Sequence, residues 1–502
     1  MIKHLLLIGA ILTAPLAMSA TDFFITPDGA GDKTGTTWGN AMGLTEYYAH
    51  MKFYFKANGD IPKTEVNDAH TGEQYFFSTG TYTFNQTIFI SRSGVTFKGS
   101  YDPATGEPAT SGRTTFNGNN NARKNGAIFI CDNTERNTDA AKSRAVNISG
   151  IDFENFVTNG EWRGDDTNWQ SGRPSAIYIS FSGHVEIADC NFRNNKCTGS
   201  GDNAMAGALS LNKVNAMVRN CSFTGNEGTD GGAIKQYYNQ SGDWTKMAYL
   251  TIDGCYFSGN KSTNSGGAIY ARNSQQLNII NSTISGNEAT NGGGVHSNGP
   301  GNYTQLLNIV SSTIAGNSAT NGSQVYTGGN GVLKVANSII VSDGGADAIA
   351  DASANTAAYT FQGNNFIGSV AEGYTKAESD MIGADNTYAA IFGENTMAEN
   401  GTITPVKFVA GMAPASIVAI VTEEAWPFTV DSAVDQLGNA RTDKTSNGAL
   451  AVKDTTTGID TIADDASVEG DNAWYTLQGL RLSERPAAKG IYIHNGRKFI
   501  IR

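Results

Sequence analysis

The chain has 502 residues, with 35 basic and 47 acidic side chains and a formal net charge of −12 at pH 7. Glycine without a three-residue period excludes a collagen-like fibre, and 39% hydrophobic residues argue against a disordered chain. The acidic balance, with only 16% of residues charged, argues against a nucleic-acid partner.

Residues 1–19 have the features of a signal peptide. Lys3 precedes an apolar run at 5–14, and Ala17 and Ser19 suit the −3 and −1 positions of a cleavage site. The run is too short to span a bilayer. We therefore expect a secreted or surface-located protein with no transmembrane segment after signal removal. A buried N-terminal helix is the alternative.

An internal repeat follows an expected N-terminal cap at 20–74 and fills residues 75–345. Each copy begins with apolar residues at alternate positions. A small residue and a further apolar residue follow, and most copies end with an asparagine. The copies are VNISGIDFENF (146–156), VEIADCNFRNN (185–195), AMVRNCSFTGN (216–226), LTIDGCYFSGN (250–260), LNIINSTISGN (277–287), LNIVSSTIAGN (307–317) and LKVANSIIVSD (333–343).

A second motif runs in phase with the first. Its copies are GAIFI (126–130), SAIYI (175–179), GALSL (207–211), GAIKQ (232–236), GAIYA (267–271), GVHS (294–297) and QVYT (324–327). Period-two alternation with Gly, Asn and Thr at the corners predicts two or three short strands per unit. Such units bury an apolar core only by stacking. We therefore predict an all-β fold, a right-handed single-stranded parallel β-helix, in preference to a propeller or a helical array.

In-register stacking would align one residue type from each unit in columns inside the β-helix. One column is asparagine, whose amides can bond to one another and to turn backbone (Asn195, Asn226, Asn260, Asn287 and Asn317). A second holds small residues (Cys190, Cys221, Cys255, Ser282, Ser312 and Ser338). The cysteine count is five, and we expect free buried thiols in this column, with disulfide pairing as the alternative.

A third column would face outward beside the second motif: Phe129, Tyr178, Ser210, Lys235, Tyr270, His296 and Tyr326. Aromatic rings spaced at the coil rise can stack on sugars, while basic groups contact hydroxyls or uronates. Our candidate glycan-binding residues are Tyr178, Lys235, Tyr237, Trp244, Tyr270, Arg272, His296 and Tyr326. The alternative is that these aromatic side chains only stabilise the sheet.

Catalysis is less well supported by the sequence. Hydrolysis needs two facing carboxylates, and we interpret Asp165, Asp166 and Asp230 as turn residues. Lyase chemistry needs a base beside cations, which Lys235 and His296 could supply together with Arg272. Catalytic residues therefore stay unassigned. Cysteine and histidine spacings indicate no metal site, and we expect no cofactor.

The C-terminal third lacks clear repeats. We interpret residues 346–453 as decorated terminal coils, 454–473 as a linker and 474–502 as a separate tail. Two short strands about Asn495-Gly496 predict a β-hairpin within that tail. A plain hairpin that closes the fold is the alternative to a sorting function.

Two motifs resemble known families. F-x-x-N paired with GGAI (223–226 with 231–234, and 257–260 with 266–269) resembles the chlamydial polymorphic outer-membrane-protein repeat, which implies surface display and adhesion. FITPDGAGDKTGTTWGNAM (24–42) and GTYTF (80–84) are similar to the start of pectin-lyase-like β-helix proteins.

The tail WYTLQGLRLSERPAAKGIYIHNGRKFIIR (474–502) is similar to the type IX secretion C-terminal sorting domain of Bacteroidetes. That resemblance implies an outer-membrane-associated or released protein, whose export machinery recognises the tail. We expect an adhesin-like protein that contacts glycans or host molecules. The alternative is a polysaccharide lyase or glycoside hydrolase acting in the aromatic groove.

Overall fold

The computed structural model describes residues 22–51, 72–90, 94–123, 126–131, 145–158, 175–180, 183–200, 204–237, 249–299, 304–344, 347–352, 358–370, 373–421, 433–442, 445–452, 474–476, 481–482, 484–486, 490–494 and 497–501. The expected signal peptide, Asp165-Asp166 and Trp244 lie outside these ranges. The chain forms two compact units that divide between Val452 and Lys453. None of the helices in the described ranges is long and apolar enough to cross a bilayer.

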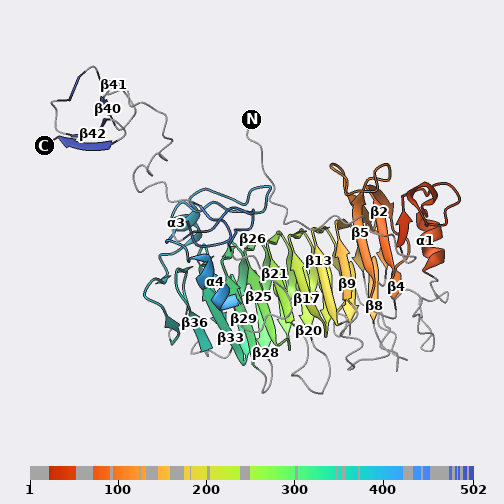
Figure 1. The fold of residues 1–502 in the computed structure, drawn as a ribbon. Helices are drawn as coiled ribbons and strands as arrows, with labels where there is room; N and C mark the ends of the chain where they lie inside the picture. Colours follow the sequence, from red (N-terminus) through yellow and green to blue (C-terminus); the bar gives the residue numbers. More distant parts are fainter. Residues whose placement is uncertain are drawn as a thin grey trace. The chain divides into compact units, whose positions relative to one another are not determined.

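The first unit is a parallel β-helix, which confirms the predicted fold class (Figure 1). Its longest sheet has twelve strands: β1 (Asp22–Ile25), β2 (Gln74–Ser78), β5 (Thr96–Tyr101), β9 (Ala145–Ser149), β13 (His184–Ala188), β17 (Asn215–Arg219), β21 (Tyr249–Asp253), β25 (Gln276–Ile280), β29 (Gln305–Val310), β33 (Gly331–Ala336), β36 (Tyr359–Phe361) and β38 (Thr375–Lys376). The eleven-stranded sheet contains β3 (Gly80–Thr83), β6 (Thr114–Asn117), β10 (Ile151–Glu154), β14 (Asn191–Arg193), β18 (Ser222–Thr224), β22 (Tyr256–Ser258), β26 (Thr283–Ser285), β30 (Thr313–Ala315), β34 (Ile339–Val341), β37 (Phe366–Ile367) and β39 (Met381–Ile382).

Two further sheets complete the middle turns of the β-helix. The seven-stranded sheet contains β7 (Ala122–Arg123), β11 (Val157–Thr158), β15 (Lys196–Cys197), β19 (Glu227–Asp230), β23 (Lys261–Ser265), β27 (Glu288–Asn291) and β31 (Ser318–Asn321). The nine-stranded sheet contains β4 (Ile88–Ile90), β8 (Ile128–Cys131), β12 (Ile177–Ser180), β16 (Leu209–Asn212), β20 (Ile234–Tyr237), β24 (Ile269–Arg272), β28 (Val295–Gly299), β32 (Val325–Gly329) and β35 (Ile349–Asp351).

The middle coils therefore have four strands each, whereas the sequence predicted two or three. The strand that was missed is the one in the seven-stranded sheet, such as β23 and β27. These strands consist of charged and small polar residues, and most of their side chains are exposed or half-buried. Because they bury little apolar surface, their sequences carry no hydrophobic alternation.

The interior columns form as predicted. The rings of Phe192, Phe223 and Phe257 stack with centroids 4.7 Å apart. In the asparagine column, the Asn226 side-chain amide donates to Asn260 Oδ1 at 2.9 Å and to the Phe192 carbonyl at 3.0 Å. Gln324 ends this column by accepting from Asn317 Nδ2 at 2.8 Å.

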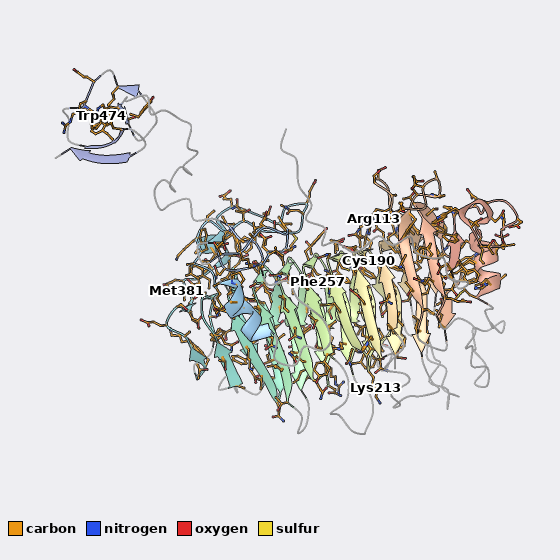
Figure 2. All side chains as sticks on the ribbon, viewed as in Figure 1. Arg113, Cys190, Lys213, Phe257, Met381 and Trp474 are labelled. Atoms are coloured by element: carbon orange, nitrogen blue, oxygen red, sulfur yellow. The ribbon has the colours of Figure 1, made fainter. Side chains whose placement is uncertain are left out.

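The column of small residues also holds together by hydrogen bonds. Cys190, Cys221 and Cys255 are free thiols, as expected, and Cys197, outside the column, is a free thiol as well. The sulfur of Cys255 accepts from the Cys221 backbone N–H at 3.3 Å, and the Ser282 hydroxyl does the same for Cys255 at 3.1 Å. Figure 2 shows Cys190 and Phe257 among the strands, in contrast to Met381, which is 48% exposed.

Additional elements cover the N-terminal end of the β-helix and part of its outer surface. The N-terminal end carries a 3₁₀ turn, η1 (Trp38–Asn40), and α1 (Leu44–His50), which buries Tyr47 and Tyr48 (Figure 1). After the last coil in the sequence come α3 (Tyr388–Phe392) and α4 (Pro414–Val421). Phe392 of α3 packs outside the eleven-stranded sheet, and Ile417 of α4 packs against Ile280 and Val310 at the ends of twelve-stranded-sheet strands.

The second unit is a small antiparallel sheet. Its strands are β40 (Trp474–Thr476), β41 (Arg481–Leu482), β42 (Gly490–His494) and β43 (Arg497–Ile501). Strands β42 and β43 pair as the predicted hairpin, and β40 and β41 extend it. The Asn495-Gly496 turn lies outside the described residues.

Candidate functional site

Seven side chains form a column on the outer face of the nine-stranded sheet, in the register that the sequence predicts. Pairing between successive strands aligns them one coil apart. The residues flanking Tyr270, which are Ile269 and Ala271, belong to the core, so the alternating column points away from it. We call this set the outer column: Phe129, Tyr178, Ser210, Lys235, Tyr270, His296 and Tyr326.

Most of the outer column is not an open groove, which corrects the expectation from the sequence. The buried candidates are Tyr178 at 3% exposure, Lys235 at 7%, Tyr237 at 6%, Tyr270 at 5% and His296 at 6%. One reason is a second apolar cluster outside the core, in which Met205 and Cys197 pack with Phe129, Tyr178 and Tyr237. Among the described candidates, only Arg272 is exposed and Tyr326 half-buried.

The N-terminal half of the outer column is bonded internally. The Phe129 and Tyr178 rings stack with centroids 4.9 Å apart. The hydroxyls of Tyr178 and Tyr237 lie 3.2 Å apart, and the Asn212 amide donates to the Tyr178 hydroxyl at 3.4 Å. These polar ends are used within the protein, so this half stabilises the sheet.

Lys235 is the one charged member of the column, and the structure gives it a partner. Its ammonium donates to Asp230 Oδ2 at 3.0 Å and to the backbone carbonyl of Ala204. It also lies 5.0 Å from the ring centroid of Tyr237 and 5.8 Å from that of Tyr270. Burial lowers the pKa of Lys235, and the Asp230 carboxylate opposes that shift.

Asp230 was interpreted from sequence as a turn residue, and its contact with Lys235 was missed. Pairing between coils aligns Asp230 with Ser265, Asn291 and Asn321, so an acidic side chain replaces a neutral one in a single coil. The basic member of the outer column, Lys235, lies in that same coil. A charged residue replaces the usual uncharged one at both positions of the same coil. That coincidence is the feature of the sequence from which the ion pair could have been predicted.

His296 is held between two aromatic rings. Its ring centroid lies 5.1 Å from that of Tyr270 and 5.0 Å from that of Tyr326. Burial lowers the pKa of His296 to about 4 and raises that of Tyr270 to about 12, so both are neutral at pH 7. Among the described residues, the buried Nδ1 of His296 has no hydrogen-bond partner.

An accessible patch remains at the C-terminal end of the column. It consists of Arg272, Asn298 and Tyr326 on the adjoining strands β24, β28 and β32, and we call it the Arg272 patch. Asn298 is half-buried and pairs in register with Arg272. Sequence reasoning missed Asn298, although its place two residues after His296 puts it on the same face.

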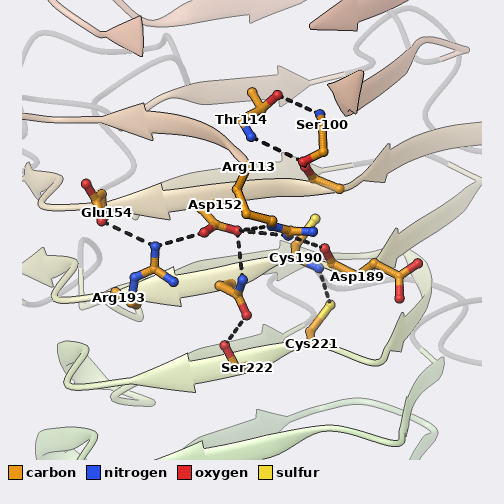
Figure 3. Close-up of polar contacts among 12 residues, drawn as sticks. Ser100, Arg113, Thr114, Asp152, Glu154, Asp189, Cys190, Arg193, Cys221 and Ser222 are labelled. Carbon is orange, nitrogen blue, oxygen red and sulfur yellow. Dashed lines mark hydrogen bonds and ion pairs between the residues drawn. The ribbon is translucent and has the colours of Figure 1, made fainter. Parts of the chain in front are cut away.

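A separate ionic cluster lies on the eleven-stranded sheet (Figure 3). The buried Asp152 carboxylate accepts from Arg113 Nη2 and from Arg193 Nη2, each at 2.8 Å, and from the Asn191 amide at 2.7 Å. Glu154 lies 3.5 Å from Arg193. Both carboxylate oxygens of Asp152 are therefore occupied, so this cluster joins three coils and does not offer a free acid or base.

The described side chains hold no group of three or more His, Cys, Asp and Glu residues placed to bind a metal ion. Two described carboxylates lie beside the outer column: Asp230, which is bonded to Lys235, and Asp351, which accepts from the Thr327 hydroxyl beside Tyr326. Four coils separate β20 from β35, a distance of about 19 Å at the spacing of paired strands, so these two do not form the facing pair that glycoside hydrolysis requires. The arrangement can bind a ring through Tyr326 and polar groups through Arg272 and Asn298.

One stretch of the repeat is similar to a known family. Residues 254–272 match the Chlamydia polymorphic membrane protein repeat, over the stretch that contains F-x-x-N and GGAI. No curated protein sequence matches the chain. Among solved structures, it is similar to pectate lyase Pel9A, with a TM-score of 0.43 and 13% identity over 86% of this chain and 96% of that one. It is also similar to a rhamnogalacturonan lyase, with a TM-score of 0.36 and 11% identity over 79% of this chain and 97% of that one.

Proposed function

We propose that this β-helix protein is displayed on the cell surface or secreted, and that it binds glycans through the Arg272 patch. The observation that carries the proposal is the accessible set of an aromatic ring, a guanidinium and an amide on adjoining strands. Rings stack on the apolar face of a sugar, and guanidinium and amide groups bond to hydroxyls and carboxylates. The buried part of the outer column would fix the Tyr326 ring by packing His296 against it.

A glycan array with the full chain tests this proposal. We expect the wild type to bind at least one glycan class and Arg272→Ala/Tyr326→Ala to bind it about tenfold more weakly or worse. Lys376→Ala removes an exposed cation at the last coil and serves as the control with unchanged binding. The absence of any bound glycan, or equal binding by the double variant, would refute the assignment.

A polysaccharide lyase is the second candidate, and Lys235 is the observation that favours it. β-Elimination needs a base to remove the proton beside a uronate carboxylate, while the glycosidic oxygen leaves and a double bond forms. A lowered lysine pKa beside a neutral tyrosine suits that step. The burial of Lys235 and its two acceptors suit a structural ion pair better, which is why we rank binding first.

An assay for unsaturated products decides between glycan binding alone and lyase activity. The protein is incubated with uronate polysaccharides, and the products are detected by their ultraviolet absorbance. The lyase proposal requires activity that is lost in Lys235→Ala and reduced in Tyr270→Phe, a variant that keeps the ring. Activity that persists in Lys235→Ala would reject this site.

We also propose that residues 474–502 are recognised by export machinery. The separate antiparallel sheet of β40–β43 supports this proposal, because a compact terminal unit can be bound without unfolding the β-helix. Deletion of 474–502 should leave the protein inside the cell envelope, as measured by surface labelling. Normal delivery of the truncated protein would contradict the proposal.

A further inference from the structure

A cavity of about 430 Å³ lies outside the twelve-stranded sheet, away from the outer column. One wall is formed where β17 and β21 end and the chain turns toward the next sheet. The opposite wall is a turn from the segment 433–452. The lining residues of the first wall are Arg219, Asn220, Asp253, Gly254 and Asn281, and those of the second are Val434, Asp435, Gln436, Leu437 and Gly438.

The second wall is held rigidly on the β-helix. Arg441 is 4% exposed and donates to Asn281 Oδ1 at 3.1 Å and to the Ser311 carbonyl at 3.4 Å. Gln436 accepts from the Thr283 hydroxyl at 2.6 Å. These contacts join positions more than a hundred residues apart in the sequence, so the cavity exists only in the folded chain.

The turn itself is also fixed. The Asp435 carboxylate accepts from the backbone N–H groups of Leu437 at 2.9 Å, Asn439 at 2.8 Å and Ala451 at 2.8 Å. Asp435 is therefore occupied as a turn former. Its bonds hold Leu437 at the cavity with 43% of its surface exposed.

The cavity offers a hydrogen-bond donor, acceptors and an apolar surface. The donor is the Arg219 guanidinium, whose side chain is 34% exposed and whose Nη1 lies 3.9 Å from Glu186 Oε1. Its Nε is buried and, among the described residues, has no hydrogen-bond partner. Asp253 supplies carboxylate oxygens, one of which accepts from the Asn281 amide at 3.3 Å, and Leu437 supplies the apolar surface. The lining contains one guanidinium, Arg219, and two carboxylates, Asp253 and Asp435, of which Asp435 is occupied by backbone N–H groups. This balance of charge does not favour an anionic ligand.

We propose that this cavity binds a neutral, polyhydroxylated ligand of one or two sugar rings. Hydroxyl groups both donate and accept, so they can bond to Arg219 and to Asp253 at once, while the ring face packs on Leu437. Its volume is within the range of small-molecule sites. The site is independent of the Arg272 patch, which lies on the nine-stranded sheet.

The test is ligand-observed saturation-transfer NMR with the full chain, using maltose, cellobiose, lactose and galacturonate as separate probes. At least one neutral disaccharide should bind, and galacturonate should bind more weakly because Asp253 repels its carboxylate. Arg219→Gln should weaken the neutral sugar about tenfold. Leu437→Ser should weaken it as well, and its exposure makes unfolding by this change unexpected.

The matched control is Val406→Ser, which changes another exposed apolar residue, at 62% exposure, that does not line the cavity. It should bind as the wild type does, and so should Arg272→Ala/Tyr326→Ala, which separates this site from the proposed surface function. The inference is overturned if no neutral disaccharide binds, if galacturonate binds more tightly than all of them, or if Arg219→Gln and Leu437→Ser both bind as the wild type does.

Discussion

The interior columns and the outer column of this β-helix are built on the same coils but differ in how they use repetition. Inside, one residue type recurs, and each copy bonds to the next, as Asn195, Asn226 and Asn260 do. Outside, residue type changes from coil to coil, from Ser210 to Lys235 to Tyr270. Repetition marks the residues that hold the coils together, and departures from it mark the residues with individual chemistry.

The physical reason lies in what each position can contact. An interior side chain is enclosed by the coils above and below, so its polar groups must find partners in those coils. A repeated asparagine provides that partner in coil after coil. An outer side chain contacts loops and turns that differ between coils. Lys235, for example, finds Asp230 and the Ala204 carbonyl, which no other coil reproduces in the described residues.

Asn226→Ala should give the largest loss of stability. The substitution removes the bonds to Asn260 Oδ1 and to the Phe192 carbonyl, and it leaves the buried Asn195 backbone N–H without its acceptor. Each buried unsatisfied group costs about 1–3 kcal/mol, so we expect the free energy of unfolding in urea to fall by about 4 kcal/mol.

Asn321→Ala is the control for this change. Asn321 is exposed and donates to Asn291 Oδ1 at 2.8 Å on the seven-stranded sheet. Its loss should cost less than about 1 kcal/mol, because water replaces the bond. Equal losses of unfolding free energy in the two variants would show that the interior asparagine column contributes no more to stability than the exposed pair does.

The features of the fold that could be predicted from the sequence are those that repeat from coil to coil. The stacking of Phe223 on Phe257 and the alignment of the asparagine column follow from spacing alone. The burial of Tyr178 did not follow, because it depends on non-repeating residues such as Met205.

The cavity lined by Arg219 and Leu437 could not be predicted from the sequence for a related reason. One of its walls comes from a segment more than 150 residues later, joined to the β-helix by Gln436 and Arg441. Nothing in the local pattern of either segment encodes that contact.

His296 should make stability depend on pH in a way that the interior columns do not. Its folded-state pKa of about 4 lies below the ordinary value of 6.5, so between these two pH values the unfolded chain binds a proton that the folded chain does not. Stability is therefore complete above pH 6.5 and falls as the pH drops, by about 3 kcal/mol at pH 4.

Urea unfolding of wild type and His296→Gln from pH 7 to pH 4 measures this contribution. The difference between their free energies of unfolding should change by about 3 kcal/mol over that range, with the wild type losing more. An NMR titration of the His296 ring provides a direct value. Parallel pH curves, or a ring that titrates near pH 6.5, would show that the column is open to water at this position.

Glu227→Ala should have the smallest effect, although Glu227 directly follows Asn226. Lys196, Glu227, Lys261 and Glu288 each follow an interior asparagine and form a row of alternating charges on the seven-stranded sheet. Lys196 and Glu227 pair with side-chain exposures of 46% and 48%. Exposed ion pairs contribute little, so we expect a loss below about 1 kcal/mol in urea unfolding, reduced further in high salt. A loss comparable to that of Asn226→Ala, or one insensitive to salt, would mean that the exposed ion pairs stabilise the coils as much as the interior columns do.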